Sequence, residues 1–200
     1  MTEMAVRSID GIKDISYPSA ESGSEYVSGW RSYAILLTLF LVSAISQADR
    51  ILPFIMAEAI KAELSLSDTQ VGLLTGVPFA ICYTLLSLPL GRAADRGSPR
   101  FVLVLCILAW SAMTALGGVA ASFLVLALTR FGVASGEAGA FPAGHAIIAR
   151  KIRPQRRGLA IGLFAMGLPL GAMVGFAAGG AIADQLGWRI VLVGAGAIGG

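Results

Sequence analysis

Apolar residues are gathered into long blocks separated by short polar stretches. Most of these blocks reach the roughly 20 residues that an α-helix needs to cross the hydrocarbon core of a bilayer. Their order along the chain therefore predicts a bundle of membrane-spanning helices. We place the blocks at about 32–57, 71–90, 101–121, 123–149, 158–183 and 190–200. The last is too short to cross a bilayer, and we expect it to be an incomplete sixth helix. The predicted fold class is an all-α membrane protein.

Composition agrees with a membrane protein and argues against a soluble enzyme. Of the 200 residues, 56% are hydrophobic and 14% are charged, and the mean hydropathy is +0.78. An ordinary soluble chain is about 25% charged. Cys82 and Cys106 both fall inside apolar blocks, where they indicate neither a disulfide nor a metal site. Since the sequence contains no Ser/His/Asp set and no phosphate-binding loop, we predict neither catalysis nor a cofactor.

The basic residues lie between the apolar blocks and predict the orientation of the chain. The loops at 91–100 and 150–157 are rich in arginine and lysine, whereas the connection after the third block has no basic residue and the one after the first block has only Lys61. Basic loops stay in the cytoplasm. The N-terminus and both basic loops are therefore predicted to be cytoplasmic, and nucleic acid is not an expected partner. The polar tail at 1–31, rich in serine, glycine and acidic residues, is predicted to be disordered.

Four ionisable residues interrupt the first and fourth apolar blocks: Asp49, Arg50, Arg130 and Glu137. A charge near the centre of a bilayer costs about 2.5–3.5 kcal/mol on insertion scales, so it is seldom there without a function. Arg130 and Glu137 lie seven residues apart, about two helical turns, and so share one face. The similar depths of Asp49 and Arg130 allow these two to pair, which would leave Arg50 and Glu137 to pair or to face a water-filled cavity.

This set of charges has two interpretations. The first is a site for substrate binding and proton coupling, in which Glu137 carries the proton, because an apolar environment favours the neutral form of a carboxylate. The second is a static ion pair that only fastens helices together. We favour the first, because four charged groups at membrane depth exceed what fastening requires.

Small residues recur at every fourth position in three of the blocks and predict close packing of helices, since small side chains let two backbones approach in lipid. The three series are Gly72, Gly76 and Ala80; Gly132, Gly136, Ala140 and Gly144; and Gly167, Gly171, Gly175 and Gly179.

The loop GRAADRGSPR at 91–100 resembles the signature loop between the second and third helices of the major facilitator superfamily. The resemblance implies a gating latch on the cytoplasmic side during alternating access. Its residues would be Gly91, Asp95, Arg96 and Arg100. The loop departs from the family pattern at Ser98, where glycine is usual, and at Pro99, where a basic residue is usual.

Three further features, AELSLSDTQVGLLTG, the Asp49–Arg50 pair and TRFGVASGEAGAFPAGH, are similar to bacterial spinster-like transporters. This resemblance implies that Asp49, Arg50, Arg130 and Glu137 form the central charged site of a secondary transporter. The expected substrate is an amphipathic, lipid-like or anionic small molecule, and the expected coupling ion is H⁺. GEAGAFPA and Gly187-Trp188-Arg189 are also similar to organic-anion and sugar-acid symporters, in which the buried arginine would face a carboxylate.

Members of this superfamily have twelve helices in two halves, and the resemblance here extends only to the N-terminal six-helix bundle. The expected partners are therefore a missing C-terminal half or a second chain, the lipid bilayer of the cell (inner) membrane, and the substrate. We expect the 200-residue chain not to transport by itself. The alternative is a non-transporting half-bundle that serves as an interaction module.

Overall fold

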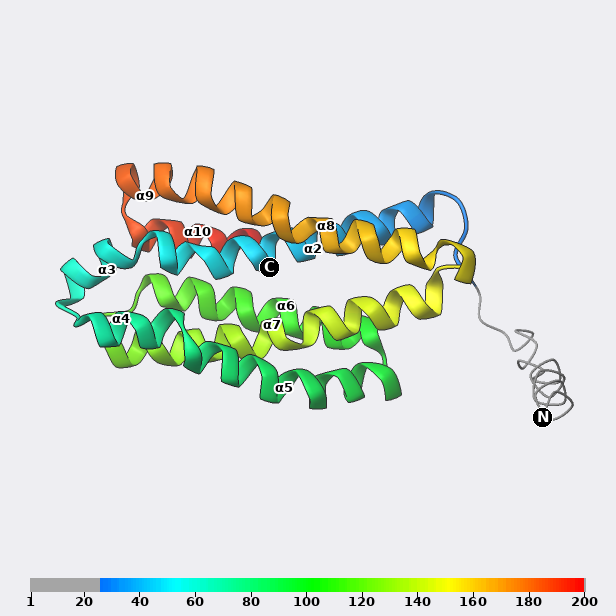
Figure 1. The fold of residues 1–200 in the computed structure, drawn as a ribbon, viewed down its shortest axis with the longest axis horizontal. Helices are drawn as coiled ribbons and strands as arrows, with labels where there is room; N and C mark the ends of the chain where they lie inside the picture. Colours follow the sequence, from blue (N-terminus) through cyan, green and yellow to red (C-terminus); the bar gives the residue numbers. More distant parts are fainter. Residues whose placement is uncertain (1–25, 200) are drawn as a thin grey trace, which may run out of the picture.

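The computed structural model describes residues 26–199, and these form helices joined by short connections (Figure 1). The predicted all-α fold class is confirmed. The helices run back and forth along one long axis. In chain order they are α2 (Trp30–Ile55), α3 (Ala57–Leu64), α4 (Asp68–Thr75), α5 (Val77–Arg96), α6 (Pro99–Gly118), α7 (Phe123–Lys151), the 3₁₀ turn η1 (Pro154–Arg156), α8 (Arg157–Val174), the π-helical turn η2 (Gly175–Gly179), α9 (Gly180–Leu186) and α10 (Trp188–Gly199).

Five stretches are long and apolar enough to cross a membrane, by length and composition: Trp30–Ile55, Asp68–Arg96, Pro99–Gly118, Phe123–Lys151 and Pro154–Leu186. The last apolar helix, Trp188–Gly199, is shorter. The predicted disordered tail lies almost entirely outside the described residues, as does Gly200.

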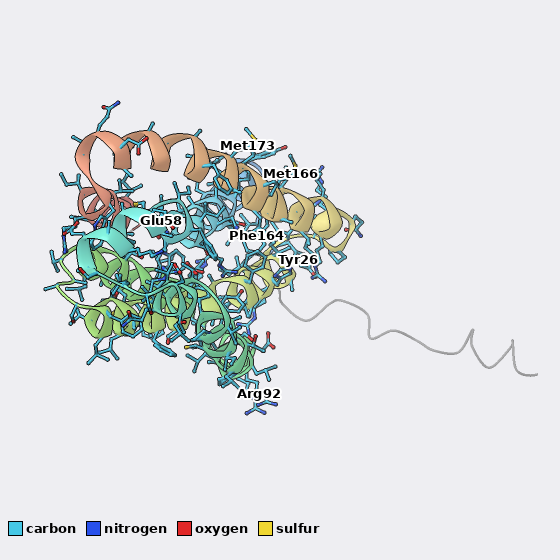
Figure 2. The ribbon with its side chains drawn as sticks, turned by 60° about the vertical axis from the view of Figure 1, so that its left-hand side comes forward. Tyr26, Glu58, Arg92, Phe164, Met166 and Met173 are labelled. Atoms are coloured by element: carbon cyan, nitrogen blue, oxygen red, sulfur yellow. The ribbon has the colours of Figure 1, made fainter. Side chains whose placement is uncertain are left out.

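Large apolar side chains cover the outer surface of the bundle, as lipid contact requires. Leu85 and Leu88 on α5 are 66% and 65% exposed. On α8, Met166 and Met173 lie on the outer side, whereas Phe164 points inward and is buried (Figure 2).

Several helix boundaries follow from local side-chain chemistry. The Ser67 hydroxyl accepts from the Gln70 backbone N–H at 3.2 Å, and the Gln70 side chain accepts from the Ser67 N–H at 2.9 Å. Together the two hydrogen bonds form a capping box at the start of α4. Ser98 caps α6, with Pro99 at the first helical position, where the missing N–H of proline has no cost.

Two of the expected continuous helices are interrupted. The second membrane stretch breaks at Gly76, because Pro78 has no N–H to donate to the Leu74 carbonyl. The stretch after the second basic loop contains the π-helical turn η2 at Gly175–Gly179. α2 continues through Pro53 and ends at Ile55, where the Met56 N–H donates to the Leu52 carbonyl at 3.0 Å.

Close helix packing is confirmed for two of the three glycine series. A Cβ added at Gly171 would collide with the backbone of Ala44 on α2, and one at Gly136 would lie 2.7 Å from the backbone nitrogen of Trp110 on α6. α8 therefore lies directly on α2, and α7 on α6.

The contacts of α8 and η2 with α2 advance by four residues on both sides. Gly171 meets Ala44, Gly175 meets Ala48 and Gly179 meets Leu52. The packing prediction for the first series is wrong, since a Cβ at Gly72 would have nothing within 4 Å.

Candidate substrate and coupling site

An ion pair between Arg50 on α2 and Glu137 on α7 lies at the centre of the bundle. Arg50 Nη2 and Nε donate to the same carboxylate oxygen, Glu137 Oε2, at 2.7 and 3.1 Å. The Glu137 side chain is fully buried, whereas that of Arg50 is 33% exposed. Of the two arrangements that the sequence leaves open for these residues, direct pairing is the one present.

The pair between Asp49 and Arg130 that the depths allow is absent from the described part of the chain, where no ion pair joins the two. Both residues are buried, at 2% and 7% exposure. Adjacent residues on a helix point about 100° apart, so Asp49 faces a different neighbour from Arg50. It lines a groove of about 350 Å³ between α2, η2 and α10, and it is the charged residue among otherwise apolar lining residues.

Arg130 is held by an aromatic ring. Its guanidinium carbon lies 4.9 Å from the ring centre of Phe79 on α5, and the guanidinium carbon of Arg50 lies 4.7 Å from that of Tyr83. A cation over an aromatic face is attracted by the electrons of the ring. The sequence analysis missed both aromatics. Both lie in the block at 71–90, which has no charged residue. Their four-residue spacing, which puts them on one face of a helix, is the signal that could have identified them.

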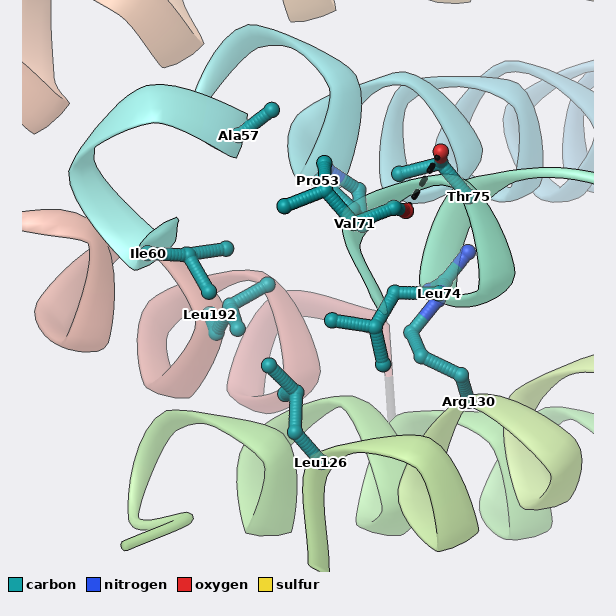
Figure 3. Close-up of a pocket in the computed structure, with 9 residues that line it drawn as sticks. All are labelled: Pro53, Ala57, Ile60, Val71, Leu74, Thr75, Leu126, Arg130 and Leu192. Carbon is teal, nitrogen blue, oxygen red and sulfur yellow. Dashed lines mark hydrogen bonds between the residues drawn. The ribbon is translucent and has the colours of Figure 1, made fainter. Parts of the chain in front are cut away.

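Arg130 lines a small pocket together with apolar side chains from α2, α3, α4 and α10 (Figure 3). Figure 3 shows Arg130 extending from α7 toward Leu74 and Thr75 on α4, where the Thr75 hydroxyl donates to the Val71 carbonyl at 3.0 Å.

Three buried polar atoms of this site have no hydrogen-bond partner within residues 26–199: Asp49 Oδ2, Arg130 Nε and Glu137 Oε1. Buried polar groups are rarely left unpaired, so each such atom needs an explanation. Here one donor and two acceptors occur together. The arrangement can bind an anion through the arginine and hold a proton on either carboxylate. Residues 26–199 contain no group of three His, Cys, Asp or Glu side chains able to hold a metal.

The predicted gating loop lies at the end of α5, where Asp95, Arg96 and Arg100 are exposed. The contact with α7 there comes from Arg150, which the sequence analysis treated only as a topology signal. Its guanidinium donates to the carbonyls of Gly97 at 2.8 Å and Ala94 at 3.1 Å, and also to that of Asp95. A cation is favoured at the C-terminal end of a helix, where carbonyls lack partners.

A second cluster of contacts joins three elements at the opposite end of the bundle (Figure 1). The Glu63 carboxylate of α3 accepts from Trp188 Nε1 at 2.6 Å and from Arg189 Nε at 2.8 Å. Arg189 Nη1 also donates to the carbonyls of Gly118 at 3.1 Å and Ala120 at 2.6 Å. We call Glu63, Trp188 and Arg189 the outer clamp. The hydrogen bond from Arg189, followed by that from Trp188, lowers the pKa of Glu63.

A glutamine at position 63 is expected to lower the melting temperature (Tm) at neutral pH and to flatten its dependence on acid. A carboxylate whose folded pKa is lowered stabilises the fold above its ordinary pKa and loses that contribution as pH falls through the folded value. The wild-type Tm should therefore fall between pH 6 and pH 3 by more than that of Glu63→Gln, as measured by thermal unfolding in detergent. Glu58→Gln, an exposed change on the same helix, is the control. Equal acid dependence in all three proteins would contradict the role of Glu63.

Comparison with known proteins identifies the family. The family model of the Major Facilitator Superfamily matches residues 38–200. An MFS-type efflux pump of Mycolicibacterium smegmatis is 42% identical over 168 residues, covering 84% of this chain and 39% of the relative. A "Probable L-galactonate transporter" of Escherichia coli is 32% identical over 164 residues, covering 82% of this chain and 36% of the relative.

A solved structure is also similar. It is the inward-facing, occupied crystal structure of a bacterial homologue of the human lysosomal transporter Spinster. The TM-score is 0.82 and the identity 38%, with 86% of this chain and 43% of that chain covered. The chain thus spans less than half the length of the relatives it matches. The family model and these relatives lead to one assignment: the chain belongs to the Major Facilitator Superfamily.

Proposed function

We propose that this chain forms the N-terminal half of a proton-coupled secondary transporter for an amphipathic organic anion. The observation that carries the proposal is the Arg50–Glu137 pair between α2 and α7, together with polar atoms of Asp49 and Arg130 that have no hydrogen-bond partner among residues 26–199. The anionic group of the substrate would bind the arginines, and its apolar part would contact Phe79 and Tyr83.

Coupling would arise from competition for Arg50. A substrate anion that binds Arg50 displaces the Glu137 carboxylate, which is then buried without its partner. An unpaired buried carboxylate is costly, so Glu137 takes up a proton. Proton binding at Glu137 and anion binding at Arg50 thus favour each other.

Alternating access would expose this site to the two sides of the membrane in turn. With the basic loops in the cytoplasm, the gating loop formed by Gly91, Asp95, Arg96 and Arg100 would close the inner side together with Arg150. The outer clamp would close the other side. The tail at 1–31 would be cytoplasmic, and the membrane domain would cover 32–200.

The substrate class follows from the site and from the relatives. Proteins of this similarity group are described as transporters of L-galactonate, sulfoacetate and hexuronate, all of which are small organic anions. The aromatic faces near Arg50 and Arg130 favour an anion with an apolar part, in keeping with the similarity to a Spinster homologue.

Uptake by proteoliposomes tests the proposal. The chain would be reconstituted alone and together with the C-terminal half of the E. coli L-galactonate relative, and offered radiolabelled L-galactonate, sulfoacetate or a lysophospholipid. We expect saturable uptake only with both halves, accelerated several-fold when the proton gradient is reversed from outward to inward. Binding of the two halves without uptake of any of these anions would favour an interaction module.

A further inference from the structure

A groove of about 630 Å³ separates the start of α2 from the start of α8 at the end that carries the basic loops. Arg153 and Arg156 line it, together with the hydroxyl-bearing Ser28 and Tyr33. Among residues 26–199, no acidic side chain lines it. The groove is far along the bundle from the outer clamp and shares no residue with the central site (Figure 1).

The arginines around this groove have different partners. Arg150 binds the carbonyls at the end of α5. Arg157 donates to the carbonyls of Ile152 at 3.1 Å and Ala149 at 2.5 Å, at the end of α7. Arg153 and Arg156, by contrast, are exposed, and no ion pair engages them within residues 26–199. Two arginines thus stabilise helix ends, and two present their charge to the groove.

Backbone contacts fix the polar end of the groove. The Val27 N–H donates to the Lys151 carbonyl at 3.0 Å, and the Ser32 hydroxyl donates to the Val27 carbonyl at 2.6 Å. The chain before α2 is therefore attached to the end of α7. Tyr26, at the start of this segment, lies close to the α7–α8 connection (Figure 2). The arginines and hydroxyls consequently line one groove, from two chain segments that are hydrogen-bonded together.

The other wall of the groove is apolar. Leu36 lines it from α2, and Leu159 and Leu163 line it from α8. The two α8 leucines are 68% and 38% exposed and lie one turn apart on the same face. The groove thus changes from cationic at its end to apolar along the helices, in the direction of the membrane interior.

We propose that this groove binds an anionic phospholipid of the cytoplasmic leaflet, such as phosphatidylglycerol. The phosphodiester pairs with Arg153 and Arg156, the hydroxyl of Tyr33 donates to it, and one acyl chain lies along the leucines. Guanidinium groups bind phosphate oxygens through paired N–H donors, and basic pockets between membrane helices on the cytoplasmic side suit such headgroups. The bound lipid would link α2 to α8. The proposal rests on the cytoplasmic placement of the basic loops and not on the transported substrate.

Native mass spectrometry of the full 200-residue chain in detergent tests the proposal. Titration with phosphatidylglycerol should give one tight binding event that phosphatidylcholine does not reproduce. In Arg153→Gln/Arg156→Gln the affinity for phosphatidylglycerol should fall by at least about tenfold, because the loss of each basic residue is expected to weaken binding about fivefold. Arg92→Gln/Arg100→Gln removes the same charge from the other basic loop and should change the affinity less than about twofold.

A second variant guards against loss of folding in the arginine double mutant. Leu159→Glu places a negative charge in the groove at an exposed position and should also abolish the tight binding event. An equal loss of affinity for phosphatidylglycerol in Arg153→Gln/Arg156→Gln and in Arg92→Gln/Arg100→Gln would indicate nonspecific electrostatic attraction. That result would overturn the proposal. Unchanged binding in Leu159→Glu would overturn it as well.

Two other occupants are distinguished by the same assay. Displacement of phosphatidylglycerol by millimolar inorganic phosphate would show that the groove recognises free phosphate rather than a lipid. The segment 1–25 contains Glu3, Asp10, Asp14, Glu21 and Glu25, and its removal should leave lipid binding unchanged. Tight binding that appears only after this removal would identify the chain's own acidic segment as the occupant. Either result would overturn the proposal.

Discussion

Glu137→Gln is expected to abolish the pH dependence of uptake by the reconstituted two-half transporter. Glutamine keeps the shape of the side chain and can still accept a hydrogen bond from Arg50, but it cannot gain or lose a proton. If Glu137 carries the coupled proton, the rate should become flat between pH 5.5 and 8, and the acceleration by an inward proton gradient should disappear. Substrate binding should persist, because Arg50 and Arg130 remain.

The matched control for this experiment is Glu58→Gln, an exposed change on α3 that should leave the pH profile unaltered. Glu137→Ala should lower the stability of the fold more than Glu137→Gln does. Removing one partner of a buried ion pair costs about 3–5 kcal/mol, and this upper range is reduced here because Arg50 is 33% exposed. Unchanged pH dependence in Glu137→Gln would exclude Glu137 as the proton carrier and leave Asp49 as the next candidate.

Gly171→Leu is expected to disrupt the bundle. A Cβ at this position already collides with the Ala44 backbone, and backbone atoms cannot move aside without separating α8 from α2. Overpacking a well-packed contact typically costs about 1–3 kcal/mol, and a leucine should reach or exceed the upper value here. Thermal unfolding in detergent would measure the loss of stability, and size-exclusion chromatography would show whether the protein remains compact.

Gly162→Leu provides a matched control for this change. It lies on the same helix and receives the same side chain, but its added Cβ would have nothing within 4 Å. Its stability should therefore stay within about 0.5 kcal/mol of wild type, as for ordinary surface changes. Similar losses in the two variants would show that leucine harms the helix itself and that the α2–α8 contact is not decisive.

The helical fold could be predicted from the sequence because bilayer thickness fixes the length of each apolar block. The capping box at Ser67 and the cap at Ser98 can also be predicted from the sequence, since both depend on neighbours within three residues. The interruptions at Gly76 and η2 were not predicted. They depend on a proline without a donor and on how a glycine-rich stretch packs against α2.

The central site was predictable in its members but not in its pairing. Depth along a helix follows from residue counting, and it brought Asp49 and Arg130 to similar heights. Pairing depends also on the direction in which each side chain points, which changes by about 100° per residue. Asp49 therefore turns toward η2 and α10, while Arg50 reaches Glu137.

The partners missed by the sequence analysis share one property, which is that they come from other elements. Phe79 and Tyr83 belong to a block without charges, Glu63 to a connection, and Arg150 to a loop that was counted for topology. Such contacts require knowledge of which helices are neighbours. Apolar periodicity and motif spacing do not supply it.

The regular steps between α8 and α2 have a mechanical consequence. In a straight α-helix a four-residue repeat turns by about 40° at each step and gradually leaves its partner. The wider π-helical turn at η2 counteracts this rotation, so that Gly179 still meets Leu52. A shift by one repeat, or about 6 Å, would bring Gly171 opposite Ala48 and Gly175 opposite Leu52. A ratchet movement along this seam would therefore pass from one set of glycine contacts to another.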